Sequence, residues 1–201
     1  MIQMIFGSPV VFLKADNVKE LFSEKTYQET IEQLMHPDNK FIDHPFTRGG
    51  KSCTTDLDAE MGIGKIQGLK ILYEFLKNIA LNYVHLYTDK SVKDLKFCTS
   101  WVNLTFQGCE IKNHNDNYYN AEKSLIVTFY PRVPENGSKL VFIHNSKHGE
   151  WASDCLEENL IRTVIEEGDI VIFDNFISHA VDAHGSTIPR MCIATEFTIV
   201  T

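Results

Sequence analysis

Residues 110–130, "EIKNHNDNYYNAEKSLIVTFY", join a cluster of polar side chains to an apolar run that is typical of a β-strand. Within this stretch His114 and Asp116 flank a single asparagine. Residues i and i+2 of a strand point to the same side, so an imidazole and a carboxylate at this spacing can bind one metal ion. Two interpretations are open from these residues alone: a hydrophilic loop, or a strand that directs two ligands to one point.

The chain from about residue 95 onward consists of short β-branched and aromatic runs separated by turn signals. "PENG" at 134–137 is typical of a hairpin turn, with Asn136 and Gly137 suited to positive φ. "EEGD" at 166–169 predicts another tight connection. The six strand candidates are "KFCTSWVNLTF" (96–106), "SLIVTFYP" (124–131), "SKLVFIHN" (138–145), "LIRTVIEE" (160–167), "DIVIFD" (169–174) and "RMCIATEFTIV" (190–200).

In the first half of the chain, apolar side chains mostly recur with the period of an α-helix. After an opening strand at 9–14, apolar side chains recur at helical spacing over 16–36 and again over 65–88. The loop from His36 to Asp56 is long enough to act as a lid over a site. Short strands after two helices predict a mainly β fold, a β-sandwich or jelly roll that the N-terminal helices buttress.

We predict a single domain over residues 1–201, because this length supports one sizeable core. Residues 1–94 form the helical buttress and lid loop, and residues 95–201 form the jelly-roll core. A net charge of -8 argues against nucleic acid as a partner. Five cysteines without a CxxC pair indicate a reducing compartment. With no basic leader and no apolar run of membrane length, the expected location is the cytoplasm, without membrane association.

The last predicted strand separates two kinds of side chain. Met191, Ile193, Phe197 and Ile199 fall on one face, which suits packing against the helices. The other face, with Arg190, Cys192 and Ala194, is suited to line a barrel interior. A buried arginine requires an anionic partner, because an unpaired buried charge is too costly.

A second histidine completes a possible ligand set. His179 follows the apolar strand at 169–174, and the intervening strands leave room for it to return beside His114 and Asp116. Two histidines and one carboxylate are the ligands of non-haem Fe(II) oxygenases, in which three coordination positions stay open. The remaining histidines, His144, His148 and His184, are predicted to lie at the surface.

With these residues the chain resembles the iron(II)/2-oxoglutarate-dependent oxygenases, which share an H-x-D…H motif on a double-stranded β-helix. The matching segments are "HND" at 114–116, "SHAV" at 178–181 and "PR" at 189–190. "SWVNLTFQG" at 100–108 is similar to a small group of oxygenases that open the barrel with W-x-N and a later glycine. The resemblance covers roughly residues 98 to 200 and not the N-terminal half.

The resemblance implies a site for Fe(II), 2-oxoglutarate and O₂. His114, Asp116 and His179 would bind the metal, and Arg190 would pair with the distal carboxylate of 2-oxoglutarate, assisted by Tyr130 in the prolyl-hydroxylase-like branch. Asn103 and Thr128 point to the same interior and are weaker candidates for contact with 2-oxoglutarate. The carboxylate of Asp116 favours hydroxylation over halogenation, because halogenases of this fold lack it.

Three functions remain open from the sequence. The first is hydroxylation of a small molecule such as an amino acid or a biosynthetic intermediate. The second is hydroxylation of a protein side chain, as in prolyl hydroxylases. The third is a non-catalytic jelly-roll binding module. The sequence does not indicate the oligomeric state.

Overall fold

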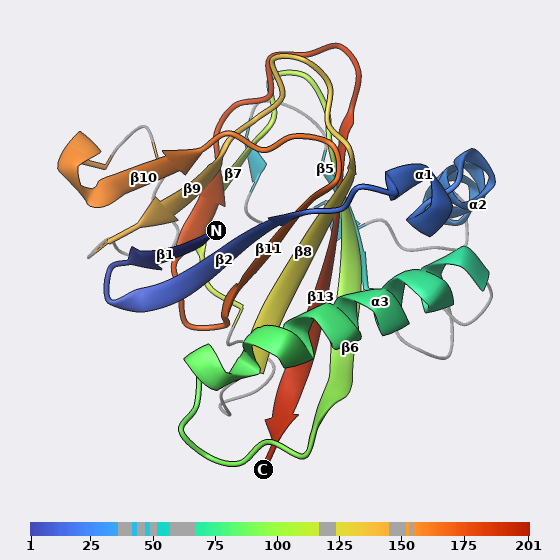
Figure 1. Cartoon of the computed structure of the whole chain (residues 1–201). Helices are drawn as coiled ribbons and strands as arrows, with labels where there is room; N and C mark the ends of the chain where they lie inside the picture. Colours follow the sequence, from blue (N-terminus) through green and yellow to red (C-terminus); the bar gives the residue numbers. More distant parts are fainter. Residues whose placement is uncertain are drawn as a thin grey trace.

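The computed structural model describes residues 1–35, 42–43, 47–48, 52–56, 67–116, 124–144, 152 and 155–201. In this part of the chain two antiparallel sheets form the body of the molecule, and the long helix α3 (Gln67–Tyr83) crosses the outer face of the larger sheet (Figure 1). The two-sheet arrangement confirms the predicted fold class, a mainly β double-stranded β-helix, or jelly roll, with N-terminal helices.

The larger sheet has eight strands in the order β1-β2-β11-β8-β13-β6-β5-β3. These strands are β1 (Ile2–Ile5), β2 (Ser8–Lys14), β3 (Ile42–Asp43), β5 (Ser52–Asp56), β6 (Asp94–Thr105), β8 (Ser124–Arg132), β11 (Asp169–Asp174) and β13 (Arg190–Val200). The smaller sheet has the order β10-β9-β12-β7-β4. Its strands are β4 (Thr47–Arg48), β7 (Glu110–His114), β9 (Leu140–Ile143), β10 (Leu160–Thr163) and β12 (His179–Val181). The helical elements are α1 (Val18–Leu21), α2 (Glu24–Met35), α3, and the 3₁₀ turns η2 (Val84–Leu86) and η4 (Glu157–Asn159).

Helix α3 packs on the outer face of the larger sheet. Leu72 and Leu76 of the helix share one buried cluster with Met191 and Ile193 of β13. This contact confirms the face that the sequence assigned to the helices. Truncating a leucine buried in this way to alanine costs about 2–5 kcal/mol.

A second apolar cluster fills the space between the two sheets. Ile126 and Phe173 of the larger sheet pack there with Phe142 of the smaller one, and the rings of Phe142 and Phe173 lie 5.7 Å apart. The inward-facing residues of both sheets thus form the base on which the polar site is built.

The helix predicted over residues 16–36 is two helices in the structure. Helix α1 ends at Leu21, and Phe22 takes an extended conformation with φ of -140°. Ser23 then begins α2, because its hydroxyl accepts a hydrogen bond from the backbone N–H of Thr26 at 3.2 Å. An N-cap residue in the middle of the predicted helix therefore divides it into two helices, although the apolar side chains recur at helical spacing throughout.

The "PENG" segment forms a tight turn, as predicted, but it does not form a hairpin. The N–H of Gly137 donates to the carbonyl oxygen of Pro134 at 3.0 Å, and Asn136 has a positive φ of 60°. However, β8 before the turn belongs to the larger sheet and β9 after it to the smaller one. The turn carries the chain from one sheet to the other, a connection that local turn chemistry does not distinguish from a hairpin.

The predicted loop from His36 to Asp56 contains three short strands. β5 pairs with β6 and extends the larger sheet, while β4 pairs with β7 in the smaller one. The β-branched pair Thr54–Thr55 suits this pairing, and β5 covers an edge that β6 would otherwise expose. Residues 36–41, 44–46 and 49–51 lie outside the described residues. The lid role of this segment therefore stays a prediction.

Candidate metal centre

His114 and His179 face each other across two neighbouring strands of the smaller sheet. His114 is the last residue of β7 and His179 the first of β12, and the two are direct partners in the antiparallel pairing. Their ring centroids are 4.3 Å apart. The stretch at 110–114 is therefore a strand and not a loop, which resolves the alternatives that the sequence left open.

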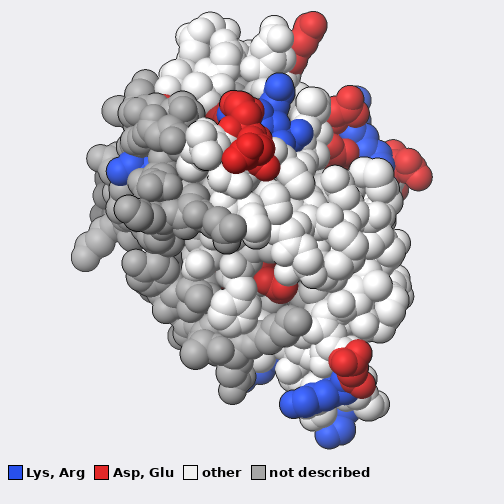
Figure 2. All heavy atoms as spheres, turned by 90° about the vertical axis from the view of Figure 1, so that its left-hand side faces the viewer, with Lys and Arg blue, Asp and Glu red and all other residues white. Residues whose placement is uncertain are grey.

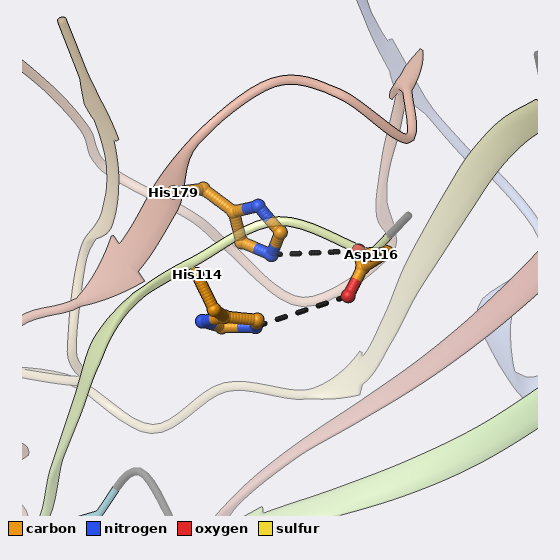
Figure 3. A group of neighbouring side chains, drawn as sticks. All are labelled: His114, Asp116 and His179. Carbon is orange, nitrogen blue, oxygen red and sulfur yellow. Dashed lines mark ion pairs between the residues drawn. The ribbon is translucent and has the colours of Figure 1, made fainter. Parts of the chain in front are cut away.

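Asp116 completes a compact triad with the two histidines (Figure 3). Its Oδ1 lies 3.9 Å from Nε2 of His114, and its Oδ2 lies 3.7 Å from Nε2 of His179. All three potential ligand atoms lie within 4.8 Å of one another. This spacing leaves room for one ion among them, because metal–nitrogen and metal–oxygen bonds of about 2 Å allow such separations.

The backbone selects the tautomer of both imidazoles. Nδ1 of His114 lies 2.8 Å from the carbonyl oxygen of Lys112, and Nδ1 of His179 lies 3.1 Å from that of Ile177. A carbonyl oxygen only accepts, so each Nδ1 carries a proton, and in the neutral ring the lone pair is on Nε2. Hydrogen bonds of this kind orient metal-binding histidines in proteins.

Asp116 has a buried oxygen that none of the described residues satisfies. Its backbone N–H donates to the carbonyl oxygen of Asn175 at 3.1 Å, which holds the residue beyond the end of β7. Its Oδ2 is buried and has no hydrogen-bond partner in the described part of the chain. Burial raises the pKa of this carboxyl group above its ordinary range. An unsatisfied carboxylate oxygen beside two imidazole lone pairs fits a divalent transition-metal ion, so the residues present fit Fe(II).

Arg190 enters the same cavity from β13. Both the triad and Arg190 line one cavity. Arg190 is only 2% exposed, and its Nε has no hydrogen-bond partner among the residues that the structure describes. Among the described residues no carboxylate forms an ion pair with it. A buried guanidinium without an acidic partner fits an anionic ligand.

The other residues predicted to contact 2-oxoglutarate line this cavity as well. Tyr130, Thr128 and Asn103 are all part of its wall. The guanidinium carbon of Arg190 lies 5.1 Å from the ring centroid of Tyr130. Burial raises the pKa of Tyr130, so its hydroxyl stays protonated and can donate. Burial likewise raises the pKa of Cys192, which lies in the same wall, to about 11.

Three residues near this cavity were not predicted from the sequence. Ser138 accepts hydrogen bonds from Arg190, and Glu196 is a buried acid on the inward side of β13. His184 was expected at the surface, but it is only 1% exposed and bonds to Ser138 and Ile188. The inward position of Glu196 could have been predicted by continuing the alternation of β13 from Arg190. No local pattern marks His184, because its partners lie far along the chain or in an irregular turn.

His144 is exposed, as predicted, and stacks on Phe6 with ring centroids 4.6 Å apart. His148 lies outside the described residues. On the face shown in Figure 2, basic and acidic side chains gather together, so the described part of that face has no purely basic patch.

The fold has counterparts among solved structures. The chain has the double-stranded β-helix fold of the 2-oxoglutarate and Fe(II)-dependent oxygenases. No family model matches its sequence, and no curated protein matches it at the sequence level.

Among particular solved structures, the chain is similar to SnoK, a non-heme alpha-ketoglutarate-dependent carbocyclase from nogalamycin biosynthesis, with a TM-score of 0.66 and 12% identity over 94% of this chain and 79% of that one. A prolyl-4-hydroxylase from Pseudomonas putida matches with a TM-score of 0.62 and 11% identity over 94% and 91% of the two chains. The epimerase SnoN, solved with Fe³⁺, alpha-ketoglutarate and nogalamycin RO, matches with a TM-score of 0.61 and 14% identity over 94% and 78%.

Proposed function

We propose that this protein is an Fe(II)/2-oxoglutarate-dependent oxygenase, a hydroxylase of a small molecule such as an amino acid or a biosynthetic intermediate. The observation that carries the proposal is that one cavity holds both the triad of His114, Asp116 and His179 and a buried Arg190, which has no acidic partner among the described residues. The triad supplies ligands for the metal, and the guanidinium supplies a counter-charge for a dicarboxylate.

Each residue has a distinct role in this proposal. The two Nε2 atoms and the carboxylate of Asp116 hold Fe(II) and leave neighbouring coordination positions open for 2-oxoglutarate and O₂. Arg190 pairs with the distal carboxylate of 2-oxoglutarate, and the Tyr130 hydroxyl donates to the same group. Thr128 and Asn103 contact 2-oxoglutarate from the sheet. Fe(II), 2-oxoglutarate and O₂ together supply oxidative decarboxylation to succinate and CO₂, coupled to hydroxylation of a C–H bond.

The protein's own contribution is position and exclusion of water. The inward faces of the sheets surround the cavity with Ile126, Leu140 and Phe173, which limit water near the reactive centre. Similarity to SnoK, a small-molecule enzyme by its name, supports the small-molecule assignment. Similarity to the Pseudomonas putida prolyl-4-hydroxylase supports the alternative, hydroxylation of a protein side chain.

None of the helices in the described part of the chain has both the length and the apolar character needed to cross a bilayer. Among the described cysteines, Cys98, Cys109, Cys155 and Cys192, no disulfide forms. The cytoplasm remains the proposed location, on the sequence pattern of five cysteines without a CxxC pair.

Formation of succinate tests the proposal. Protein supplied with Fe(II), ascorbate, 2-oxoglutarate and O₂ should release succinate, slowly without a substrate and faster with one. The His114→Ala variant should lose this activity, and the His144→Ala variant, which changes an exposed histidine, should keep it. A folded wild-type protein that makes no succinate with any candidate substrate would instead support the non-catalytic binding module.

A further inference from the structure

The described wall of the cavity contains a phenylalanine, a tyrosine and a tryptophan: Phe173, Tyr130 and Trp101. Phe173 is buried, and its ring lies 5.1 Å from that of His179. Tyr130 is buried beside the guanidinium of Arg190. Trp101 is half-buried, and none of the described residues forms a ring contact or a hydrogen bond with its indole. The indole is therefore the aromatic group of this wall that a ligand can contact.

The exposure of the lining residues shows where the cavity opens. Trp101, Asn103, His114 and Asp116 are half-buried, whereas the other described residues of the wall, Arg190 among them, are buried. Trp101 thus lies at the open side of the cavity together with two of the three proposed metal ligands. In the proposed complex 2-oxoglutarate binds Arg190 at the closed side, so a substrate that approaches the metal from the open side meets the indole.

The strand register places small side chains next to Trp101. Ala194 of β13 pairs with Trp101 of β6 on one side and with Thr128 of β8 on the other. Residues paired in this way point to the same side of a sheet, and all three line the cavity. Trp101 also packs against the apolar cluster between the two sheets, which holds the indole in place. A fixed, flat aromatic group without a bulky neighbour on β13 makes its largest contact with another planar ring.

The charges of the proposed complex favour a neutral ring over a charged group. The divalent metal ion and Arg190 carry as much positive charge as Asp116 and 2-oxoglutarate carry negative charge. An ammonium group or a carboxylate beside the indole would add an unbalanced charge to a region of low dielectric constant. The indole N–H suits a neutral acceptor instead, such as a carbonyl or hydroxyl oxygen on the substrate.

We propose that Trp101 is a specificity-determining residue that stacks on a neutral, planar aromatic ring of the substrate and so holds a C–H bond of that substrate beside the metal centre. This inference rests on the proposed function and adds to it a substrate class, namely neutral small molecules with an aromatic ring and a hydrogen-bond acceptor.

Binding without turnover tests this assignment. With Mn²⁺ in place of Fe(II), 2-oxoglutarate present and O₂ excluded, the paramagnetic relaxation of a probe's protons reports binding next to the metal. The aromatic probes are benzamide, coumarin and N-acetyl-L-phenylalaninamide. Their ring-saturated counterparts are cyclohexanecarboxamide, octahydrocoumarin and N-acetyl-L-cyclohexylalaninamide, and benzamidine is the cationic counterpart of benzamide. Calorimetry on the same samples measures 2-oxoglutarate binding separately.

We expect at least one aromatic probe to bind about fivefold or more tightly than its saturated counterpart, and benzamide to bind more tightly than benzamidine. Trp101→Leu, which keeps an apolar side chain and loses the aromatic face, should abolish the preference for aromatic probes and leave 2-oxoglutarate binding unchanged. Trp101→Phe, which keeps a ring, should retain the preference. Phe97→Leu, a similar change at a residue of β6 that packs against the outer apolar cluster under α3, should retain it as well.

Equal binding of aromatic and saturated probes, tighter binding of benzamidine, or an unchanged preference in Trp101→Leu would each overturn the assignment while the proposed function stands. Loss of 2-oxoglutarate binding in Trp101→Leu would give Trp101 a structural role and overturn it too. A wild-type protein that fails to bind 2-oxoglutarate would contradict the proposed function itself, and the assignment would fall with it.

Discussion

Ser138 accepts two hydrogen bonds from the same guanidinium nitrogen of Arg190, one to its carbonyl oxygen at 3.0 Å and one to its hydroxyl oxygen at 2.8 Å. Ser138 is in turn held by His184, because its backbone N–H donates to Nδ1 of that ring at 3.2 Å. Nε2 of His184 lies 2.8 Å from the carbonyl oxygen of Ile188 and must carry the proton. A buried neutral imidazole therefore sets the position of the residue that orients the arginine.

The Ser138→Ala substitution should weaken the binding of 2-oxoglutarate. It removes one acceptor from Arg190 while the backbone acceptor stays, so the guanidinium is less firmly oriented. A loss of about 1 kcal/mol corresponds to roughly fivefold weaker binding. Anaerobic calorimetry with Mn²⁺ in the metal site measures this change. Unaltered affinity in Ser138→Ala would show that the carbonyl oxygen alone positions the arginine.

The His184→Ala substitution should destabilise the fold. It leaves the buried backbone N–H of Ser138 without its partner, removes the hydrogen bond to the carbonyl oxygen of Ile188 and opens a cavity, which together cost about 2–4 kcal/mol. Urea unfolding should show this loss, whereas His144→Ala at the exposed ring should change the free energy of unfolding by less than about 1 kcal/mol. Similar losses in the two variants would contradict the structural role of His184.

Asp116→Asn should weaken metal binding and yet stabilise the metal-free protein. Burial raises the pKa of Asp116, so the native state keeps its proton to a higher pH than the unfolded state does. Stability of the metal-free protein is therefore lost as pH rises through the native pKa. The variant lacks this titration and should be more stable than metal-free wild type above that pH, by about 1–3 kcal/mol, while losing affinity for Mn²⁺.

Urea unfolding in the presence of a chelator, repeated across the acidic to neutral range, measures both pH dependences. Parallel curves for wild type and Asp116→Asn would mean that the burial of this carboxyl group has no energetic effect.

Tyr130→Phe tests the donor beside Arg190. The variant keeps the ring against the guanidinium and loses only the hydroxyl. If that hydroxyl donates to the distal carboxylate, KM for 2-oxoglutarate should rise by about five- to tenfold with little change in kcat. An equal fall in kcat and in kcat/KM would instead place Tyr130 in the reacting centre.

Much of the fold was predictable because it depends on local patterns. The run "DIVIFD" at 169–174 has an apolar centre and follows Gly168, and it forms β11 as expected. The alternation along β13 predicted which side chains face α3 and which face the cavity. Local patterns did not show that the turn at 134–137 joins two sheets, because this depends on packing between distant elements. The cap at Ser23 is local, but the apolar spacing that continues across it concealed the end of the first helix.

The candidate site, like the fold, was predictable in part. His114, Asp116 and His179 were predicted together because two histidines and a carboxylate match the H-x-D…H ligand pattern, although only His114 of the first pair lies on β7 and Asp116 lies just beyond it. His184 was missed because its burial is set by contacts with Ser138 and Ile188. Glu196 lay on a face that the sequence had already assigned to the interior, but its alternation was followed only as far as Ala194.

The most direct test of the proposed metal centre is anomalous scattering at the iron edge, from crystals soaked anaerobically with Fe(II) and 2-oxoglutarate. We predict one iron peak bonded to Nε2 of His114, Nε2 of His179 and the carboxylate of Asp116, with 2-oxoglutarate chelating the iron and its distal carboxylate on Arg190. No peak between these three side chains, or 2-oxoglutarate bound away from Arg190, would contradict the proposed chemistry.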